Sequence, residues 1–278
     1  MTFSVLLAVY AKENPQYLDS ALSSVYDHQT LKPGQIVLVK DGPLTEDLDD
    51  CINVWKNKLG ETLTIVELPE NAGAGKARNI GLQQCCHELV AIMDSDDVSL
   101  PDRFKKQIEF YNLNPDVALC SGYINEFKNE PDDMYSVRKV PLDNCTIVKK
   151  LKVRNTFNQV AVMFKKSAIL SVGGYDALPY FEDYDLWIRV VQAKYMVGNI
   201  PEILVNVRTG NDMISRRHGL MYAKSELFFL KLQKTRGFIS NGEYFLLVLS
   251  RIPFRFIPKK LLILVYRLLR HNKTKIEK

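Results

Sequence analysis

Short apolar runs separated by amphipathic segments dominate the first hundred residues of the chain. The apolar runs cover residues 4–9, 35–39 and 63–67 and a stretch from residue 89, and the segments between them start near residues 14, 45 and 76. Runs of this length predict buried strands, and the intervening segments predict helices. Strand–helix alternation with short links is typical of a parallel sheet with helices on both faces.

The same pattern continues less regularly after residue 97. Helices are expected at 101–112, 165–172, 182–193 and from 214 onward, and strands at 117–123, 160–164 and 203–207. Residues 128–143 are polar and contain prolines, so they are expected to form a loop. We therefore expect a domain over 1–218, with halves at 1–97 and 98–218, and a helical extension over 219–278.

The apolar run that begins at residue 89 ends abruptly in three carboxylates, Asp94, Asp96 and Asp97. Ligands of open α/β sheets bind outside the carboxyl ends of the strands. Asp94 and Asp96 are two residues apart at such an end, so their side chains can converge on one point. Oxygen ligands of this kind suit Mg²⁺ or Mn²⁺. The alternative is an acidic loop that caps the following helix.

Polar side chains also follow the other predicted strands. Tyr10 could stack on a base, and Asp41 could accept a hydrogen bond from it. Lys76 and Arg78 could bind the phosphate groups of a ligand, or they could instead lie on a solvent-exposed face of a helix. The loop 70–75 is not a Walker loop, and no Gly-x-Gly-x-x-Gly follows the first strand, which disfavours a dinucleotide cofactor.

Composition narrows the class of protein. With 278 residues, 46% apolar and 25% charged, the chain has the composition of an ordinary globular protein. Its five cysteines lack Cys-x-x-Cys spacing, which argues against a zinc site or a disulfide framework and for a reducing compartment. The first residues lack a basic region and a cleavage site, so no signal peptide is expected.

Positive charge is concentrated at the end of the chain. Residues 251–278 carry a local charge of +8, whereas the whole chain carries +5. Over 259–270, apolar and basic residues separate onto two sides of a predicted helix whose apolar run is too short to span a bilayer. We expect residues 252–270 to lie on an anionic membrane surface, or alternatively to pack on the body. No motif favours nucleic acid.

Six segments in order carry a family resemblance: SVLLAVY at 4–10, VKDG at 39–42, ENAGAGKARNIGL at 70–82, MDSDD at 93–97, PDR at 101–103 and FEDYDLW at 181–187. Over about 3–218 the chain resembles family-2 inverting glycosyltransferases, particularly those that build bacterial O-antigen and exopolysaccharide repeat units. The resemblance implies a GT-A fold, which is an α/β fold with a Rossmann-like mixed sheet. It also implies a UDP-sugar donor held by Mn²⁺ or Mg²⁺, and a polyprenyl-diphosphate-linked saccharide acceptor.

The same resemblance implies roles for individual residues. The residues expected to form the nucleoside pocket and its surroundings, where the donor binds, are Ala8, Val9, Tyr10, Asp41, Lys76, Arg78 and Ser95. Asp94 would contact the ribose or the metal, and Asp96 would ligate the metal in the Asp-x-Asp pattern. Arg208 and Arg216, with Arg217 and His218 nearby, would lie on a loop that closes over the diphosphate. The family's usual acid pair in the second segment is here Lys40-Asp41.

Catalysis requires a base for the acceptor hydroxyl. By resemblance, Asp183 occupies that position and Glu182 positions the acceptor. A helix N-terminus favours the carboxylate form, although both residues could instead simply cap the helix. The expected reaction is a single inverting displacement that transfers a hexose, galactose or glucose, at the cytoplasmic face of the bacterial inner membrane. The alternatives are a nucleotidyltransferase on a similar sheet and a non-catalytic nucleotide-sugar-binding partner.

Overall fold

The computed structural model describes residues 1–128, 133–209 and 218–257. Within them, nine strands form one sheet in the order β3-β2-β1-β4-β8-β6-β9-β5, with β7 paired to β6. The strands are β1 Phe3–Val9, β2 Gln35–Lys40, β3 Leu63–Glu67, β4 Leu89–Asp94, β5 Val98–Ser99, β6 Val117–Phe127, β7 Met134–Arg138, β8 Met163–Lys165 and β9 Met196–Arg208. Strands β1 to β4 are mutually parallel, whereas β8 is antiparallel to both β4 and β6, so the sheet is mixed.

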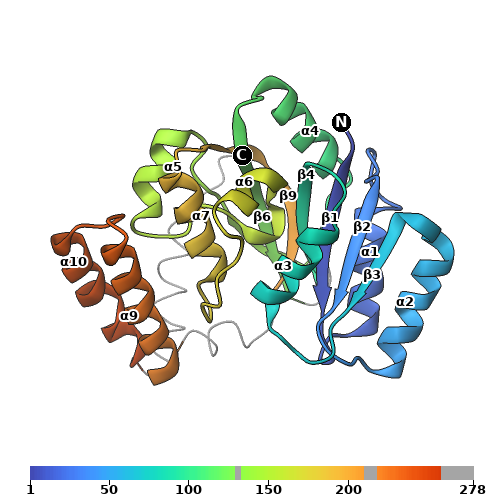
Figure 1. Ribbon diagram of the computed structural model, residues 1–278, viewed down its shortest axis with the longest axis horizontal. Coiled ribbons are helices and arrows are strands. Elements are labelled where there is room, and N and C mark those ends of the chain that lie inside the picture. Colours follow the sequence, from blue (N-terminus) through green and yellow to red (C-terminus); the bar gives the residue numbers. More distant parts are fainter. Residues whose placement is uncertain (129–132, 210–217, 258–278) are drawn as a thin grey trace. The chain divides into compact units, whose positions relative to one another are not determined.

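Helices cover both faces of the sheet (Figure 1). These are α1 Pro15–Val25, α2 Glu46–Leu59, α3 Ala74–Gln84, α4 Arg103–Leu113, α5 Asn144–Leu151, α6 Lys166–Ser171 and α7 Glu182–Gln192. Two further helices, α9 Leu220–Thr235 and α10 Asn241–Arg251, belong to a separate compact unit. Val5 and Leu7 of β1 belong to the core formed with α1, α2 and α4. Leu6, which points to the opposite face, packs under α3.

A glycine lets α3 approach the sheet closely. A Cβ added at Gly81 would come within 2.5 Å of Leu6 Cδ1 and 2.6 Å of Val39 Cγ2. The helix therefore lies directly on β1 and β2, and its first turn stands beside the carboxyl ends of these strands. This packing carries Arg78 to the edge of the sheet where the predicted site residues gather.

The predicted elements agree best with the structure in the first half, where the strand at 63–67 is found with those bounds. The loop expected at 128–143 is wrong, because β7 pairs antiparallel with β6 there. Four of the five β7 side chains are exposed, and an edge strand of this kind shows little apolar patterning. The strand expected at 160–164 is partly wrong, since a 3-10 turn at Gln159–Ala161 precedes the short β8. Helix α5 was not predicted.

The chain divides into two compact units. The first contains residues 1–177 and 182–208, and the second contains residues 178–181 and 209–278. Within the second unit, Phe181 stacks on Phe229 with ring centroids 4.7 Å apart. Glu226, which is 1% exposed, accepts hydrogen bonds from Arg251 and Arg255. Among the described residues, no helix has the length and apolar character needed to cross a membrane.

Candidate active site

The register of the parallel strands aligns the first group of predicted residues. Ala8 pairs with Asp94 on β4, and Val9 pairs with Lys40 on β2. The carboxyl ends of β1, β2 and β4 therefore meet at one edge of the sheet. Val9 is buried, and Tyr10 is 44% exposed just beyond it. An exposed aromatic ring at this edge is placed where it could stack on a bound base.

Asp41 organises the loop that leads into α3. Asp41 is 5% exposed, and its carboxylate accepts hydrogen bonds from the backbone N–H of Ala72 at 2.7 Å and of Gly73 at 3.1 Å. These two contacts fix the loop against the end of β2. Lys40, the departure from the family pattern, forms an ion pair with Glu67 at 2.7 Å. The lysine thus serves to join β2 and β3.

Carboxylates crowd the loop after β4. Burial, together with the charges of Asp94 and Glu13, raises the pKa of Asp96 to about 7. Asp97 is 2% exposed, and burial and the charge of Asp96 raise its pKa well above the ordinary value. Ser95 is buried and donates a hydrogen bond to Glu13 at 2.5 Å. The loop therefore holds several carboxylates close together, and cationic side chains offset their negative charge only in part.

This donor set fits a divalent metal held jointly with a substrate. No group of three or more His, Cys, Asp or Glu side chains arranged to hold a metal ion is present in the part of the chain that the structure describes. Asp94 and Asp96 supply two carboxylates, and Mg²⁺ sites commonly use one or two carboxylates plus substrate phosphates. Burial, followed by the charges of Asp94 and Glu13, disfavours the ionised form of Asp96 and raises its pKa, and a bound cation would oppose both effects.

Arg78 connects the two halves of the predicted site. It is 9% exposed, and its Nη2 lies 2.8 Å from Asp94 Oδ1. Its Nη1 lies 3.9 Å from Glu182 Oε1, and its guanidinium is 5.8 Å from the Tyr175 ring centroid. Burial alone would lower the pKa of Arg78, but the carboxylates overcome this and raise it. Lys76, by contrast, lies on the exposed side of α3.

Glu182 and Asp183, the two acids at the start of α7, have different surroundings. Burial, followed by the charge of Asp183, raises the pKa of Glu182. Asp183 accepts a hydrogen bond from Asn155 Nδ2 at 2.8 Å and one from the backbone N–H of Tyr184 at 2.7 Å. These two hydrogen bonds hold both oxygens of Asp183, the carboxylate that the sequence predicts as the base.

Arg208, at the end of β9, lies against the acidic loop. Its backbone N–H donates to Asp97 Oδ1 at 2.8 Å, and its Nε donates to the Asp96 carbonyl oxygen at 3.2 Å. The guanidinium lies 3.7 Å from the Tyr17 ring centroid and 4.7 Å from that of Phe127. The predicted diphosphate-binding arginine is thus close to the predicted metal ligands. Arg216 and Arg217 lie outside the described residues.

Several described residues that contact the predicted site were not predicted from the sequence, among them Glu13, Asn155 and Tyr175. Glu13 belongs to the loop after β1, and its position at a strand exit is a signal that could have identified it. Asn155 and Tyr175 carry no such signal, because only tertiary packing brings them to Asp183 and Arg78.

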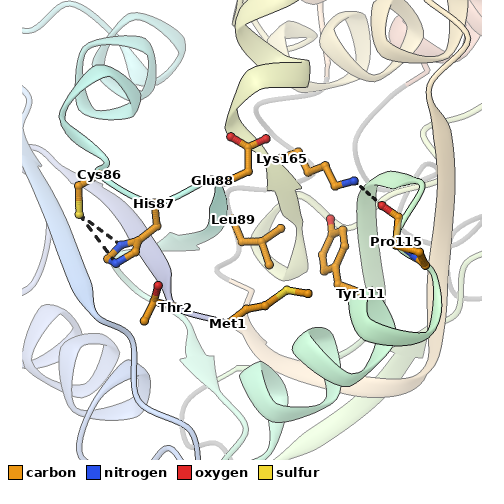
Figure 2. A pocket seen from close by; sticks show the side chains of 9 residues that line it. All are labelled: Met1, Thr2, Cys86, His87, Glu88, Leu89, Tyr111, Pro115 and Lys165. Atoms are coloured by element: carbon orange, nitrogen blue, oxygen red, sulfur yellow. Dashed lines mark hydrogen bonds between the residues drawn. The ribbon is translucent and has the colours of Figure 1, made fainter.

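A pocket of about 490 Å³ lies elsewhere (Figure 2). Thr2 and Leu89, at the beginnings of β1 and β4, line it, with Cys86, His87 and Lys165. The starts of these parallel strands lie at the opposite edge of the sheet from Asp94. No residue predicted for the site lines this pocket, so it is separate from the candidate active site.

Comparison with known proteins identifies relatives along nearly the whole chain. Residues 4–173 match Glycosyl transferase family 2. The chain is 41% identical over 267 residues to the amylovoran biosynthesis glycosyltransferase AmsE of Erwinia amylovora, covering 95% of this chain and 97% of that protein. It is 36% identical over 256 residues to the UDP-Gal:alpha-D-GlcNAc-diphosphoundecaprenol beta-1,3-galactosyltransferase of Escherichia coli, covering 92% of each chain.

Solved structures agree on the fold. S. aureus TarS 1–349 in complex with UDP-GlcNAc is similar with a TM-score of 0.64 at 16% identity, over 92% of this chain and 72% of that one. The mannosyltransferase PcManGT from Pyrobaculum calidifontis, in complex with GDP-Man and Mn²⁺, has a TM-score of 0.62 at 15% identity, over 96% and 73%. The predicted GT-A fold, an α/β fold with a mixed sheet, is confirmed.

Proposed function

Because the chain belongs to glycosyl transferase family 2, we propose that it transfers a hexose from a UDP-sugar to a lipid-linked saccharide with inversion. One observation carries the proposal: Arg78 contacts Asp94 and lies 3.9 Å from Glu182. The residues expected to hold the donor and those expected to activate the acceptor are therefore parts of one site.

Galactose on a polyprenyl-diphosphate-linked saccharide is the favoured pair of substrates. The Escherichia coli relative is named for transfer of galactose from UDP-Gal to GlcNAc-diphosphoundecaprenol, and the Erwinia relative is named for amylovoran synthesis. Synthesis of O-antigen or exopolysaccharide repeat units is the corresponding role. The reaction would take place at the inner face of the bacterial inner membrane, where such a lipid presents its sugar.

In the proposed reaction, the acceptor hydroxyl oxygen forms a bond to the anomeric carbon while the bond from that carbon to the diphosphate breaks. Asp183 accepts the hydroxyl proton, and Glu182 binds the acceptor beside it. The departing UDP carries the released electron pair. Arg208, which lies beside the acidic loop, would offset the negative charge of the departing diphosphate. A divalent ion held by Asp94 and Asp96 would supply further positive charge to the diphosphate when bound.

The first test is nucleotide release by the purified full chain. UDP-, GDP- and dTDP-sugars would be screened with Mn²⁺ or Mg²⁺ and a short-chain lipid-diphosphate GlcNAc or GalNAc. We expect UDP release from UDP-Gal or UDP-Glc that requires both metal and acceptor. Release of pyrophosphate would instead indicate a nucleotidyltransferase. Absence of any release, with metal-dependent UDP binding intact, would favour a non-catalytic binding protein.

We also propose that the end of the chain associates with an anionic membrane. Phe245, Leu246 and Leu249 of α10 are exposed by 62%, 66% and 55% and share one side of the helix. Phe254 and Phe256 follow and are also exposed. Most of the predicted membrane segment 252–270 lies outside the described residues, but its basic sequence follows this apolar surface directly. Apolar insertion and attraction to anionic headgroups would reinforce each other.

Vesicle binding tests this association. Serine at positions 245, 246 and 249 together should weaken co-sedimentation of the chain with phosphatidylglycerol-rich vesicles by at least about tenfold, because three apolar side chains that would insert into the membrane are lost. Leu113→Ser is the matched control, since Leu113 is 82% exposed in the first unit, and it should bind as the wild type does. Equal binding by the triple variant would contradict the proposal.

A further inference from the structure

Asn155 is held in one orientation beside the acid pair. It lies in the loop between α5 and the 3-10 turn Gln159–Ala161. Its Oδ1 accepts the backbone N–H of Phe157 at 3.1 Å, and its Nδ2 donates to Asp183 Oδ2 at 2.8 Å. Because the Phe157 N–H requires an acceptor, the amide cannot be turned around without losing both contacts. The side of Asn155 that faces Asp183 is therefore a hydrogen-bond donor.

The loop that carries Asn155 is anchored to the helix that carries Asp183. Phe157 is fully buried, and its ring packs edge-on against Trp187 of α7 with centroids 5.9 Å apart. Arg138 Nη2 donates to the Asn155 carbonyl oxygen at 3.3 Å. A residue two positions from Asn155 and a residue four positions from Asp183 thus share one core. This shared packing fixes the distance between the amide and the carboxylate.

We propose that Asn155 is a positioning residue for the base Asp183. A carboxylate rotates about its Cβ–Cγ bond unless its oxygens are held. Here Asn155 holds Oδ2, and the backbone N–H of Tyr184 holds Oδ1. The inference rests on the proposed function, because it requires that Asp183 be the base.

The decisive variant is Asn155→Asp. It preserves the shape and the oxygen that accepts from Phe157, but it replaces the donor that faces Asp183 with a second carboxylate oxygen. We expect kcat to fall about a hundredfold, the scale that misplacement of a catalytic group produces. The Kd for UDP in the presence of Mn²⁺, measured by calorimetry, should change less than about twofold, because within the described residues the hydrogen bonds of Asn155 go to Arg138, Phe157 and Asp183, none of which is a predicted donor-binding residue. Asn53→Asp, at an exposed position on α2, adds the same charge and should leave both values unchanged.

A second variant separates positioning from structural support. Combining Asn155→Asp with Asp183→Asn restores an amide–carboxylate pair with the roles exchanged. We expect the melting temperature to return towards the wild-type value while turnover stays lost. Recovery of turnover in this double variant would overturn the inference, as would a wild-type kcat in Asn155→Asp. A parallel loss of UDP affinity and melting temperature in Asn155→Asp would also overturn it, because the residue would then only support the fold.

The single variant Asp183→Asn, assayed alongside, distinguishes the two possible failures. If Asp183→Asn is inactive and Asn155→Asp is fully active, the inference about Asn155 fails and the assignment of the base stands. If Asp183→Asn turns over like the wild type, the assignment of the base fails, and the role of Asn155 fails with it.

Discussion

Replacing Asp183 with asparagine is expected to lower kcat about a thousandfold while leaving the affinity for UDP unchanged. The substitution keeps the size of the side chain and one of the two oxygens that accept from Asn155 Nδ2 and the Tyr184 N–H, but an amide cannot take a proton from the acceptor. General-base catalysis contributes about 10² to 10⁴ in rate. UDP release in the presence of acceptor would be measured together with calorimetric binding of UDP, so that chemistry and donor binding are separated.

Glu182→Gln provides the comparison within the acid pair. Burial raises the pKa of Glu182, and Arg78 Nη1 lies 3.9 Å from its Oε1. If Glu182 positions the acceptor, the variant should raise the acceptor KM more than it lowers kcat. Wild-type turnover in Asp183→Asn together with a thousandfold loss in Glu182→Gln would exchange the two roles. Loss of UDP affinity in Asp183→Asn would show instead that the site had been disrupted.

The parallel half of the sheet could be predicted because of how it is buried. β1, β2 and β4 are covered on both faces, so nearly all their residues are apolar and each run is visible in the sequence. Strand β7 has exposed side chains at the edge of the sheet and leaves no such run. Strand β8 has only three residues, and the apolar residues before it belong to a 3-10 turn. Whether a strand can be predicted from the sequence therefore depends more on the burial of its side chains than on the pairing of its backbone.

The same difference applies to the site. Asp41, Asp94 and Asp96 follow strands that run in parallel, so topology alone brings them to one edge. The contact between Arg78 and Asp94 depends on how closely α3 approaches the sheet, which Gly81 permits. The hydrogen bond between Asn155 and Asp183 joins residues 28 positions apart through a loop without regular structure. No periodic pattern encodes such a contact, so it required the structure.

The lysine in the second segment illustrates a departure that the fold absorbs. The family's usual acid pair in this segment is here Lys40-Asp41, so a lysine stands before Asp41. In the structure, Lys40 pairs with Glu67 and Asp49, both of which lie outside the candidate site. Asp41 retains both of its contacts with the loop before α3. The substitution therefore changes how β2 is joined to its neighbours and leaves the arrangement of the acidic edge in place.

Replacing Asp96 with asparagine is expected to have opposite effects on stability and on activity. The Asp96 pKa, raised from 3.8 to about 7, means that the folded protein keeps a proton that the unfolded chain has released between these pH values. Stability of the metal-free protein should therefore fall as the pH rises from 3.8 to about 7. Above that range, the Asp96 charge is buried and repels Asp94 and Glu13, and Asp96→Asn removes both the cost of burying the charge and the repulsion. We expect the variant to melt at a higher temperature than the wild type at pH 8 without metal, and to lose nearly all turnover.

The response to Mn²⁺ identifies the cause of that loss. If Asp96 ligates the metal, Mn²⁺ with UDP should raise the melting temperature of the wild type at pH 8 and leave that of Asp96→Asn unchanged. The wild-type response should weaken below about pH 7, because a proton then competes with the metal for the carboxylate. Glu13→Gln is the matched control, since it removes a neighbouring carboxylate that is not a predicted ligand. It should raise the metal-free melting temperature and keep the Mn²⁺ response. An equal rise in melting temperature with Mn²⁺ in Asp96→Asn and the wild type would exclude Asp96 as a metal ligand. The Asp96 charge would then lower the stability of the fold without serving metal binding.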